Sequence, residues 1–252
     1  MSSPPVALTI AGSDSSAGAG IQADLRVFHA LGLVGASAIT AVTVQDSQRV
    51  HRIHPVPTDV VLDQVRVVLA DMRPAVIKIG MLGQGELAGE LGALLSTTGI
   101  PTVWDPVLKS SSGQDLVAGE VTSFGTLADC CVLLTPNVQE VEHAGWVGRT
   151  AASTLVTGQR VEGGFRDRLY SPQGVEVAGW TRPFVQTRND HGTGCTLSSA
   201  IAAYLALGAP LERACGLAGD RVNAWLQESA KFQVGEGRGG MQHGLGSLGL
   251  ET

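Results

Sequence analysis

A short segment, His191-Gly192-Thr193-Gly194-Cys195-Thr196, combines residue types that could together bind and activate an anion. Directly after it, residues 197–206 are rich in helix-forming residues with apolar side chains at helical spacing, which predicts a helix. A turn that opens into a helix leaves backbone N–H groups without intrahelical partners, and the helix dipole adds positive potential there. Thr193 and Thr196 could add hydroxyl donors. A second interpretation stays open: a flexible glycine loop in which Cys195 is a small buried hydrophobic residue.

Cys195 and His191 are four residues apart, a spacing that invites a thiol–imidazole nucleophile. The two glycines between them disfavour a regular helical face, and no third residue that would orient the imidazole is identifiable. A cysteine at a helix N-terminus is expected to have a lowered pKa, which suits a general base that takes a proton from a primary hydroxyl. We therefore predict that Cys195 is a general base and place a cysteine hydrolase second.

Oxygen ligands for Mg²⁺ follow two predicted strands. Asp105 comes at the end of one, and Asn137 with Glu140 comes after another. Mg²⁺ takes hard oxygen ligands, keeps several waters and shares the remaining positions with a phosphate. Each residue alone would more often be a solvated helix cap. Together, at the same edge of a sheet as the glycine segment, Asp105, Asn137 and Glu140 predict a magnesium site.

A second glycine-containing loop follows the first predicted strand, over residues 12–20. Gly18 to Ala23 formally matches the dinucleotide-binding pattern, but six residues separate Ala11 from Gly18, and that pattern needs its first glycine directly after the strand. A long loop of small residues that passes closely over a flat ligand suits the sequence better. Asp24, predicted on the first turn of the next helix, could hold a ring NH₂ or hydroxyl, or could only stabilise the helix N-terminus.

The chain has few lysines that are placed to bind a phosphate. The chain has no G-x-x-x-x-G-K-[ST] segment, which excludes a P-loop nucleotide site. Lys78 lies inside a predicted strand and is not an obvious phosphate clamp. Backbone amides and a metal are therefore the expected anion ligands.

Strands and helices alternate along the chain and would position these residues. Strands are predicted near 6–11, 36–44, 75–79, 101–106 and 129–134, with a hairpin at 165–170 and 175–180, and helices near 21–31, 58–73, 85–96, 194–207 and 211–228. This order predicts an α/β fold of three layers, α/β/α, with a mainly parallel central sheet and helices on both faces. We expect one domain over residues 1–252. Polar residues recur just past strand ends, where open α/β sheets bind ligands: Asp14, Gln45, Asp105 and Asn137.

Composition limits the classes of partner. The 252 residues carry a net charge of -6, which gives no basic surface for nucleic acid or for an anionic membrane. The apolar runs are shorter than a membrane span. The four cysteines show neither zinc-ligand spacing nor the density of a secreted disulfide scaffold. We expect a reduced, cytoplasmic enzyme.

Six segments in a fixed order resemble the hydroxymethylpyrimidine/phosphomethylpyrimidine kinases of thiamine synthesis, within the ribokinase-like group. They lie at residues 11–24, 41–45 (Ala-Val-Thr-Val-Gln), 78–82 (Lys-Ile-Gly-Met-Leu), 105–107 (Asp-Pro-Val), 134–140 (Leu-Thr-Pro-Asn-Val-Gln-Glu) and 191–198 (His-Gly-Thr-Gly-Cys-Thr-Leu-Ser). They span nearly the whole chain, and the first and last are specific. The resemblance implies a ribokinase-like fold and ATP-dependent, Mg²⁺-assisted phosphorylation of the pyrimidine hydroxymethyl group and then of its monophosphate. It also implies a homodimer.

The resemblance assigns roles to individual positions. Asp24 and Gln45 would hold the aminopyrimidine, in a pocket shaped by Gly12, Ala19, Met81 and Val107. Gly192, Thr193, Gly194 and Cys195 would form the anion hole, with Cys195 where ribokinase-like sugar kinases place an aspartate base. The residues expected to organise Mg²⁺ and the ATP phosphates are Asp105, Asn137, Glu140 and Thr193.

One segment departs from the family pattern, which carries a longer stretch after Asn-x-x-Glu and then a strand ending in Val-Lys-Gly-Gly-His. Here only residues 141–153 intervene, and Thr157 stands where the phosphate-contacting lysine is expected, with Arg160 nearby. The departure motivates a non-enzymatic alternative, a pyrimidine-binding protein with weakened or lost kinase activity. A pyridoxal kinase is the second alternative, because both substrates are flat heteroaromatic rings that bear CH₂OH.

Overall fold

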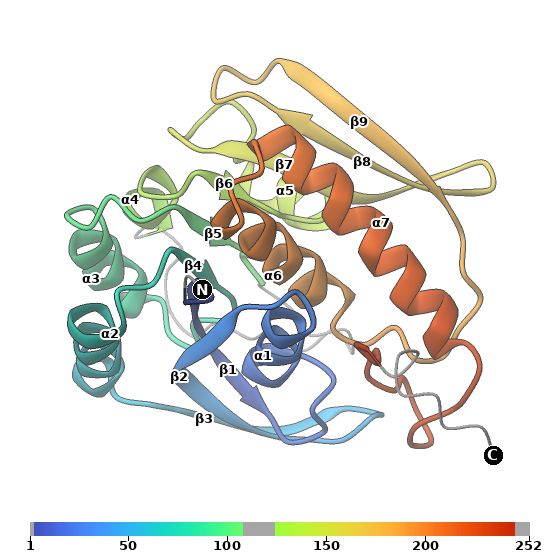
Figure 1. Cartoon of the computed structure of the whole chain (residues 1–252), viewed down its shortest axis with the longest axis horizontal. Coiled ribbons are helices and arrows are strands. Elements are labelled where there is room, and N and C mark those ends of the chain that lie inside the picture. The colour runs from blue at the N-terminus through green and yellow to red at the C-terminus, as the bar shows by residue number, and fades with distance from the viewer. Residues whose placement is uncertain (1–2, 108–123, 245–252) are drawn as a thin grey trace.

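The computed structural model describes residues 3–107 and 124–244 of the chain (Figure 1). The strands are β1 (Val6–Asp14), β2 (Val34–Gln45), β3 (Val50–Pro55), β4 (Val76–Ile79), β5 (Thr102–Trp104), β6 (Leu133–Leu134), β7 (Ser153–Val161), β8 (Gly164–Tyr170) and β9 (Glu176–Pro183). The helices are α1 (Gly20–Ala30), α2 (Thr58–Met72), α3 (Glu86–Leu95), α4 (Phe124–Asp129), α5 (Val138–Ala144), α6 (Thr193–Ala206) and α7 (Leu211–Ser229).

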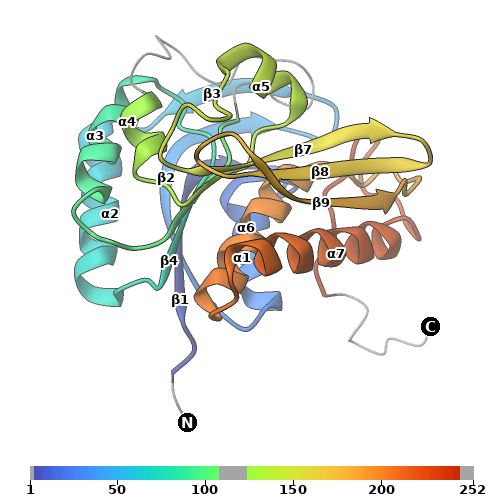
Figure 2. The ribbon, with the colours of Figure 1, turned by 90° about the horizontal axis from the view of Figure 1, so that it is seen from above.

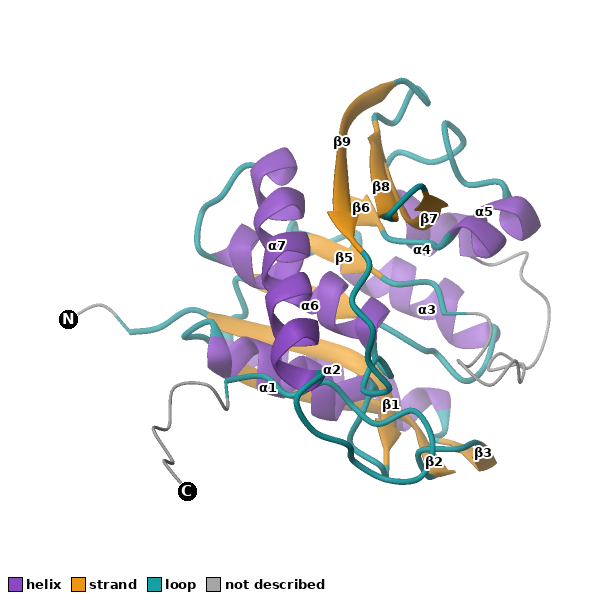
Figure 3. Cartoon of the chain, turned by 90° about the vertical axis from the view of Figure 1, so that its right-hand side faces the viewer, coloured by secondary structure: helices purple, strands orange, loops and turns teal. Residues whose placement is uncertain are grey.

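All strands of the described residues join one sheet in the order β3-β2-β1-β4-β5-β6-β7-β8-β9. The pairs from β2 through β7 are parallel, whereas β3, β8 and β9 pair antiparallel at the two ends. Figure 3 shows β8 and β9 at one end of the sheet and β2 and β3 at the other. The predicted mainly parallel sheet is confirmed.

Helices cover both faces of the sheet, as Figure 2 shows. One core packs α2, α3 and α4 against side chains such as Leu8, Ile10 and Ile79. The other packs α1, α6 and α7 against the opposite side chains of the same strands, including Ala7 and Val76. Successive strand residues point to opposite faces, so both faces of an apolar strand are buried here. The predicted three-layer arrangement is confirmed.

The predicted elements agree with the structure except at residues 129–134 and at two strands, β3 and β7, that were not predicted. The expected strand at 129–134 is wrong over most of its length, because Asp129 ends α4, residues 130–132 connect the helix to the sheet, and only Leu133–Leu134 pair as a strand. Phe124, Leu127 and Ala128 are buried at helical spacing, which explains this helix. The polar edge strand β3 carries little alternation, and the sequence did not predict it. The hairpin of β8 and β9 is confirmed, with Gly174 at φ 78° closing its turn.

The parallel strands β2, β1, β4, β5, β6 and β7 end at one edge of the sheet, and α6 packs against three of them, β1, β4 and β5. In the part of the chain that is described, no helix combines the length and apolarity that a membrane crossing needs. The sequence of residues 235–249 is rich in glycine, which predicts a loop; the stretch has no helix up to residue 244, and its last five residues lie outside the described ranges.

Candidate active site

The N-terminus of α6 forms one wall of the candidate site. Its N-cap, Gly192, has φ 82° and ψ 15°, a left-handed conformation that favours glycine, and no side chain caps the helix. Among the described residues, none accepts a hydrogen bond from the N–H of Gly194 or Cys195. These two donors lie at the positive end of the helix, where the sequence predicts anion binding.

The threonine hydroxyls do not add to this anion site as expected. Thr193 Oγ1 donates to the carbonyl oxygen of Asp190 at 2.6 Å, which uses its only donor. Thr196 is fully buried, and its Oγ1 lies 3.1 Å from Nε2 of His243. The expectation that Thr193 and Thr196 supply donors to an anion is therefore corrected, because Asp190 takes the Thr193 hydrogen bond and Thr196 is fully buried against His243.

The loop of residues 12–20 packs directly against this helix start. A Cβ on Gly192 would overlap the carbonyl oxygen of Gly18, and a Cβ on Gly18 would overlap the imidazole of His191. Gly20 has φ 57° and lies against the carbonyl oxygen of Gly12. The small residues of both segments are therefore required for close approach between two loops that are far apart in the sequence.

His191 faces Asp14 and Gln45. Its Nε2 is 3.0 Å from Asp14 Oδ2 and 2.8 Å from Gln45 Nε2, and which atom donates depends on the imidazole tautomer. Burial raises the pKa of Asp14, but hydrogen bonds from His191, Ser16 and Ala19 outweigh it, so the pKa lies below its usual value. These contacts turn His191 toward the end of β2, and no interaction joins it to Cys195 in the described part of the chain.

Four of the residues expected to hold the substrate ring lie in two groups: Met81 with Gly12, and Ala19 with Gln45. The Met81 side chain lies over Gly12, where a Cβ would be 3.4 Å from its Sδ. Ala19 N–H donates to Asp14 Oδ2 at 2.9 Å, in the same group of contacts as Gln45. Val107 is half-buried and donates its N–H to the carbonyl oxygen of Asp105 at 2.8 Å. Within the described part of the chain, Val107 makes no hydrogen bond to the other four.

Asp24 has a different place from the one expected. Its side chain has no exposed surface and accepts hydrogen bonds from Thr9 Oγ1 at 2.6 Å and Ser199 Oγ at 2.7 Å. Lys78 Nζ lies 2.9 and 3.0 Å from its two oxygens. Asp24 is the fifth residue of α1, beyond the first turn. The expectations that it binds a ring group or caps the helix are both corrected, because side chains of the protein already occupy its oxygens.

Lys78 is the main residue that sequence reasoning missed. It is fully buried in β4 among Val76, Ile77 and Ile79. Burial lowers the pKa of Lys78, but the negative charges of Asp24, of Cys195 when it is a thiolate, and of Asp105 raise the pKa by more, so the ammonium stays charged. A lysine inside a short apolar strand was itself the signal, since charged residues are almost never fully buried unless paired.

Cys195 lies in the same charged cluster. Burial raises the pKa of its thiol to about 12; Lys78 and the Gly20 N–H oppose the rise, and Asp105 and Asp24 add to it. The prediction of a lowered pKa is therefore wrong, because desolvation outweighs the helix dipole at this position. Burial likewise raises the pKa of Asp105 to about 6, although Lys78 opposes it.

Asn137 and Glu140 form a reciprocal cap at the start of α5. Asn137 Oδ1 accepts from the N–H of Glu140 at 3.0 Å, and Glu140 Oε2 accepts from the N–H of Asn137 at 2.8 Å. Thr157 lies beside Asn137 in a parallel bridge, and its N–H donates to the carbonyl oxygen of Pro136 at 2.9 Å. The structure therefore brings Asn137, Glu140 and Thr157 together: the first two cap α5, and Thr157 pairs with the backbone beside them.

These residues fit Mg²⁺ only as an open site. Within residues 3–107 and 124–244, no group of three or more His, Cys, Asp or Glu side chains is arranged to hold a metal. Asp105 and Thr135 follow neighbouring strands, and Thr135 Oγ1 is buried with no partner there. Such an orphaned hydroxyl beside a buried carboxylate fits an edge that receives a polar ligand, and Mg²⁺ held through waters and phosphates is compatible with it.

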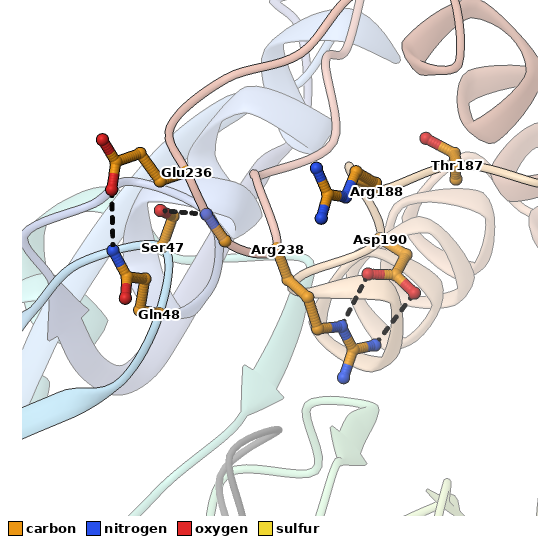
Figure 4. A pocket seen from close by; sticks show the side chains of 8 residues that line it. Ser47, Gln48, Thr187, Arg188, Asp190, Glu236 and Arg238 are labelled. Atoms are coloured by element: carbon orange, nitrogen blue, oxygen red, sulfur yellow. Dashed lines mark hydrogen bonds and ion pairs between the residues drawn. The ribbon is translucent and has the colours of Figure 1, made fainter.

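A cavity of about 590 Å³ opens beside the glycine segment (Figure 4). Arg238 pairs with Asp190 through two contacts of 2.7 and 2.9 Å, and Gln48 donates to Glu236 at 3.3 Å. The C-terminal loop thus meets the β2–β3 turn and the residues just before α6. None of the predicted site residues lines this cavity, and no sequence pattern indicated it.

Three comparisons with known proteins agree with this geometry. The sequence profile described as phosphomethylpyrimidine kinase matches residues 14–242. Hydroxymethylpyrimidine/phosphomethylpyrimidine kinases from Rhizobium meliloti and Streptomyces coelicolor are 36% and 38% identical, covering 94% and 96% of this chain and 96% and 95% of theirs. The solved structure of pyridoxal kinase from Staphylococcus aureus with AMP-PCP and pyridoxal has a TM-score of 0.83 at 27% identity, covering 98% of this chain and 96% of that one.

Proposed function

The chain belongs to the phosphomethylpyrimidine kinase family, and on that premise we propose that it uses ATP to phosphorylate 4-amino-5-hydroxymethyl-2-methylpyrimidine and then its monophosphate, in thiamine biosynthesis. One observation carries the proposal: the N–H groups of Gly194 and Cys195, which have no acceptor among the described residues, lie in the first turn of α6 at the sheet edge where Asp105 follows β5. Gly194 lies close to that carboxylate, since a Cβ on it would be 3.5 Å from Asp105 Oδ2. A phosphoryl group and its counter-charges need such donors and oxygens side by side.

The loop that follows β1 and the residues packed around it orient the substrate in this proposal. Met81 over Gly12 supplies an apolar wall for a flat ring, and the Gln45 amide supplies hydrogen-bonding atoms for its polar edge. Ala19 and Val107 complete the pocket in this proposal. Asp24 is left out of it, because the carboxylate is buried and occupied.

Charge on the transferring group is stabilised by the N–H groups of Gly194 and Cys195, with Gly192 and Thr193 fixing the turn that aims them. Asp105, Asn137 and Glu140 would hold Mg²⁺ through water and phosphate oxygens, and Asn137 and Thr157 border the ATP phosphates. When bound, Mg²⁺ neutralises negative charge on those phosphates. The catalytic advantage of this arrangement is that the donors are fixed before the reaction.

Cys195 is proposed to accept the proton of the hydroxymethyl group. Only its thiolate can do so, and at neutral pH the half-buried thiol is protonated. The groups of this chain that favour the thiolate are Lys78, the Gly20 N–H and the N-terminus of α6. Turnover by this route therefore rises with the thiolate fraction.

Two alternative functions are each supported by a specific observation. The structural similarity to a pyridoxal kinase motivates pyridoxal as substrate, although the pyrimidine kinases are more similar in sequence. Thr157 at the position of the family lysine motivates a protein that binds the pyrimidine with weakened phosphoryl transfer. A homodimer, a cytoplasmic location and a single domain over residues 1–252 remain predictions.

Release of ADP, coupled to an NADH-consuming enzyme pair, separates the three functions. The proposal predicts ADP release with hydroxymethylpyrimidine and with its monophosphate, and a lower kcat/KM with pyridoxal. A higher kcat/KM with pyridoxal would make the chain a pyridoxal kinase. Tight pyrimidine binding without ADP release from any substrate would overturn both kinase assignments.

A further inference from the structure

The Asp24–Lys78 pair is buried beneath the candidate site, and neither side chain has any exposed surface. Burying two charges costs desolvation that their attraction barely recovers, so such a pair is weak evidence of a purely stabilising role. An apolar pair of similar volume would pack here without that cost. A task beyond stability is therefore worth seeking for Lys78.

The pair joins four elements that surround the site. Lys78 belongs to β4 and Asp24 to α1, and the Asp24 carboxylate accepts hydroxyl hydrogen bonds from Thr9 on β1 and Ser199 on α6. Figure 2 shows α1 and α6 on the same side of the sheet. Since Ser199 lies four residues after Cys195, the two share one face of α6, and the pair anchors the face that carries the thiol.

The Lys78 ammonium is held on Asp24 and acts on that thiol through its charge. Gly80 leaves room for it, because a Cβ there would be 2.9 Å from Nζ. The groups that face Cys195 are Lys78 from β4, Asp105 after β5, Asp24 from α1 and the Gly20 N–H. Lys78 is the only cation among them, and it lowers the pKa of Cys195 whereas both carboxylates raise it.

We propose that Lys78, fixed by Asp24, is a positioning residue of phosphoryl transfer: it anchors the first turns of α6 and directs a buried positive charge at Cys195. The inference rests on the proposed kinase function. Lys78 does not touch the substrate in this account and acts through Cys195 and α6. It therefore affects turnover more than substrate binding.

The test uses the double variant Asp24→Asn/Lys78→Met, because removing one partner alone leaves a buried unpaired charge and endangers folding. The matched control is Asp167→Asn/Arg182→Met, which removes a partly buried ion pair of 3.2 Å between β8 and β9. Three quantities are measured for both and for the unaltered protein: kcat, the KM for the pyrimidine, and the alkylation rate of Cys195 by iodoacetamide, resolved by peptide mass spectrometry.

For Asp24→Asn/Lys78→Met we expect kcat to fall at least about tenfold while KM stays within about threefold. Lys78 lowers the pKa of Cys195 more than Asp24 raises it, so the pKa rises when both are removed. The thiolate fraction and the alkylation rate near about pH 9 therefore also fall. The control should change none of the three beyond about threefold. A folded double variant with unaltered kcat, with KM raised in proportion, or with unaltered alkylation overturns the inference. If the unaltered protein releases no ADP, the proposed kinase function fails, which is a different result from failure of the Lys78 inference. The comparison of alkylation rates tests the effect of Lys78 on Cys195 without requiring activity.

Discussion

Gly192 and Gly18 lie in contact, so close that a Cβ on Gly192 would overlap the carbonyl oxygen of Gly18. Gly192 is also the left-handed N-cap of α6, at φ 82°. The loop after β1 and the start of α6 therefore form one surface, on which the proposed ring pocket and the anion donors depend together.

We predict that Gly192→Ala lowers kcat/KM by about 100-fold or more, because the overlap displaces the N–H groups of Gly194 and Cys195 by a fraction of an ångström to an ångström. Steady-state kinetics measures the effect. Gly208→Ala is the matched control, since Gly208 has φ 86° but open space around its Cα. The control should lose about 1 kcal/mol of unfolding free energy and keep its activity. Equal kinetics for both variants would refute the coupling.

Glu140→Gln separates capping from metal binding. Glutamine can take the place of glutamate in the reciprocal cap with Asn137, so we expect the unfolding free energy to change by less than about 0.5 kcal/mol. Loss of the carboxylate charge should raise the Mg²⁺ concentration required for half-maximal activity by about tenfold. Urea titration and a Mg²⁺ titration of ADP release provide the two readings. An unaltered Mg²⁺ requirement would remove Glu140 from the metal site.

Thr157→Lys restores a lysine at the position where the family pattern expects one. Thr157 borders Asn137 at the sheet edge, so an ammonium there can reach a bound phosphate. We expect the KM for ATP to fall about tenfold while the KM for the pyrimidine is unaffected. Gln159→Lys adds the same charge two residues further along β7 and should leave both constants unaltered. If the two variants behave alike, position 157 has no special relation to ATP.

Cys195 gives the pH dependence of the proposed reaction. Burial raises the pKa of its thiol to about 12, so at neutral pH the thiolate is a small fraction that grows about tenfold for each pH unit below that pKa. A base of this kind predicts that kcat rises with pH between about 7 and 9. Cys195→Ala should abolish turnover and leave pyrimidine binding within about threefold. Undiminished turnover in that variant, or a flat profile in the unaltered protein, would show that Cys195 is not the base.

The residues that we predicted at the ends of parallel strands lie at one edge of the sheet, because the topology of the sheet decides at which edge parallel strands end. Gln45 and Asp105 follow parallel strands of one sheet, and alternating elements were enough to place them at its carboxyl edge. Asn137 and Glu140 also met as their spacing suggested, since a capping box is a local structure.

The errors arose where distant residues decide the outcome. Asp24 was judged by its place on a helix, but its partner Ser199 is 175 residues away. The pKa of Cys195 was judged from the helix dipole, whereas desolvation and two carboxylates from other elements dominate it. Burial and tertiary charge are properties of the packed structure, and single-sequence patterns do not carry them.

The most direct measurement is the identity of the product. The protein is incubated with Mg·ATP and 4-amino-5-hydroxymethyl-2-methylpyrimidine, and the pyrimidine is followed by mass spectrometry and phosphorus NMR. The account predicts conversion to the monophosphate and then to the diphosphate, with one ADP formed for each phosphoryl group transferred. A pyrimidine that binds but is recovered without any phosphate would contradict it.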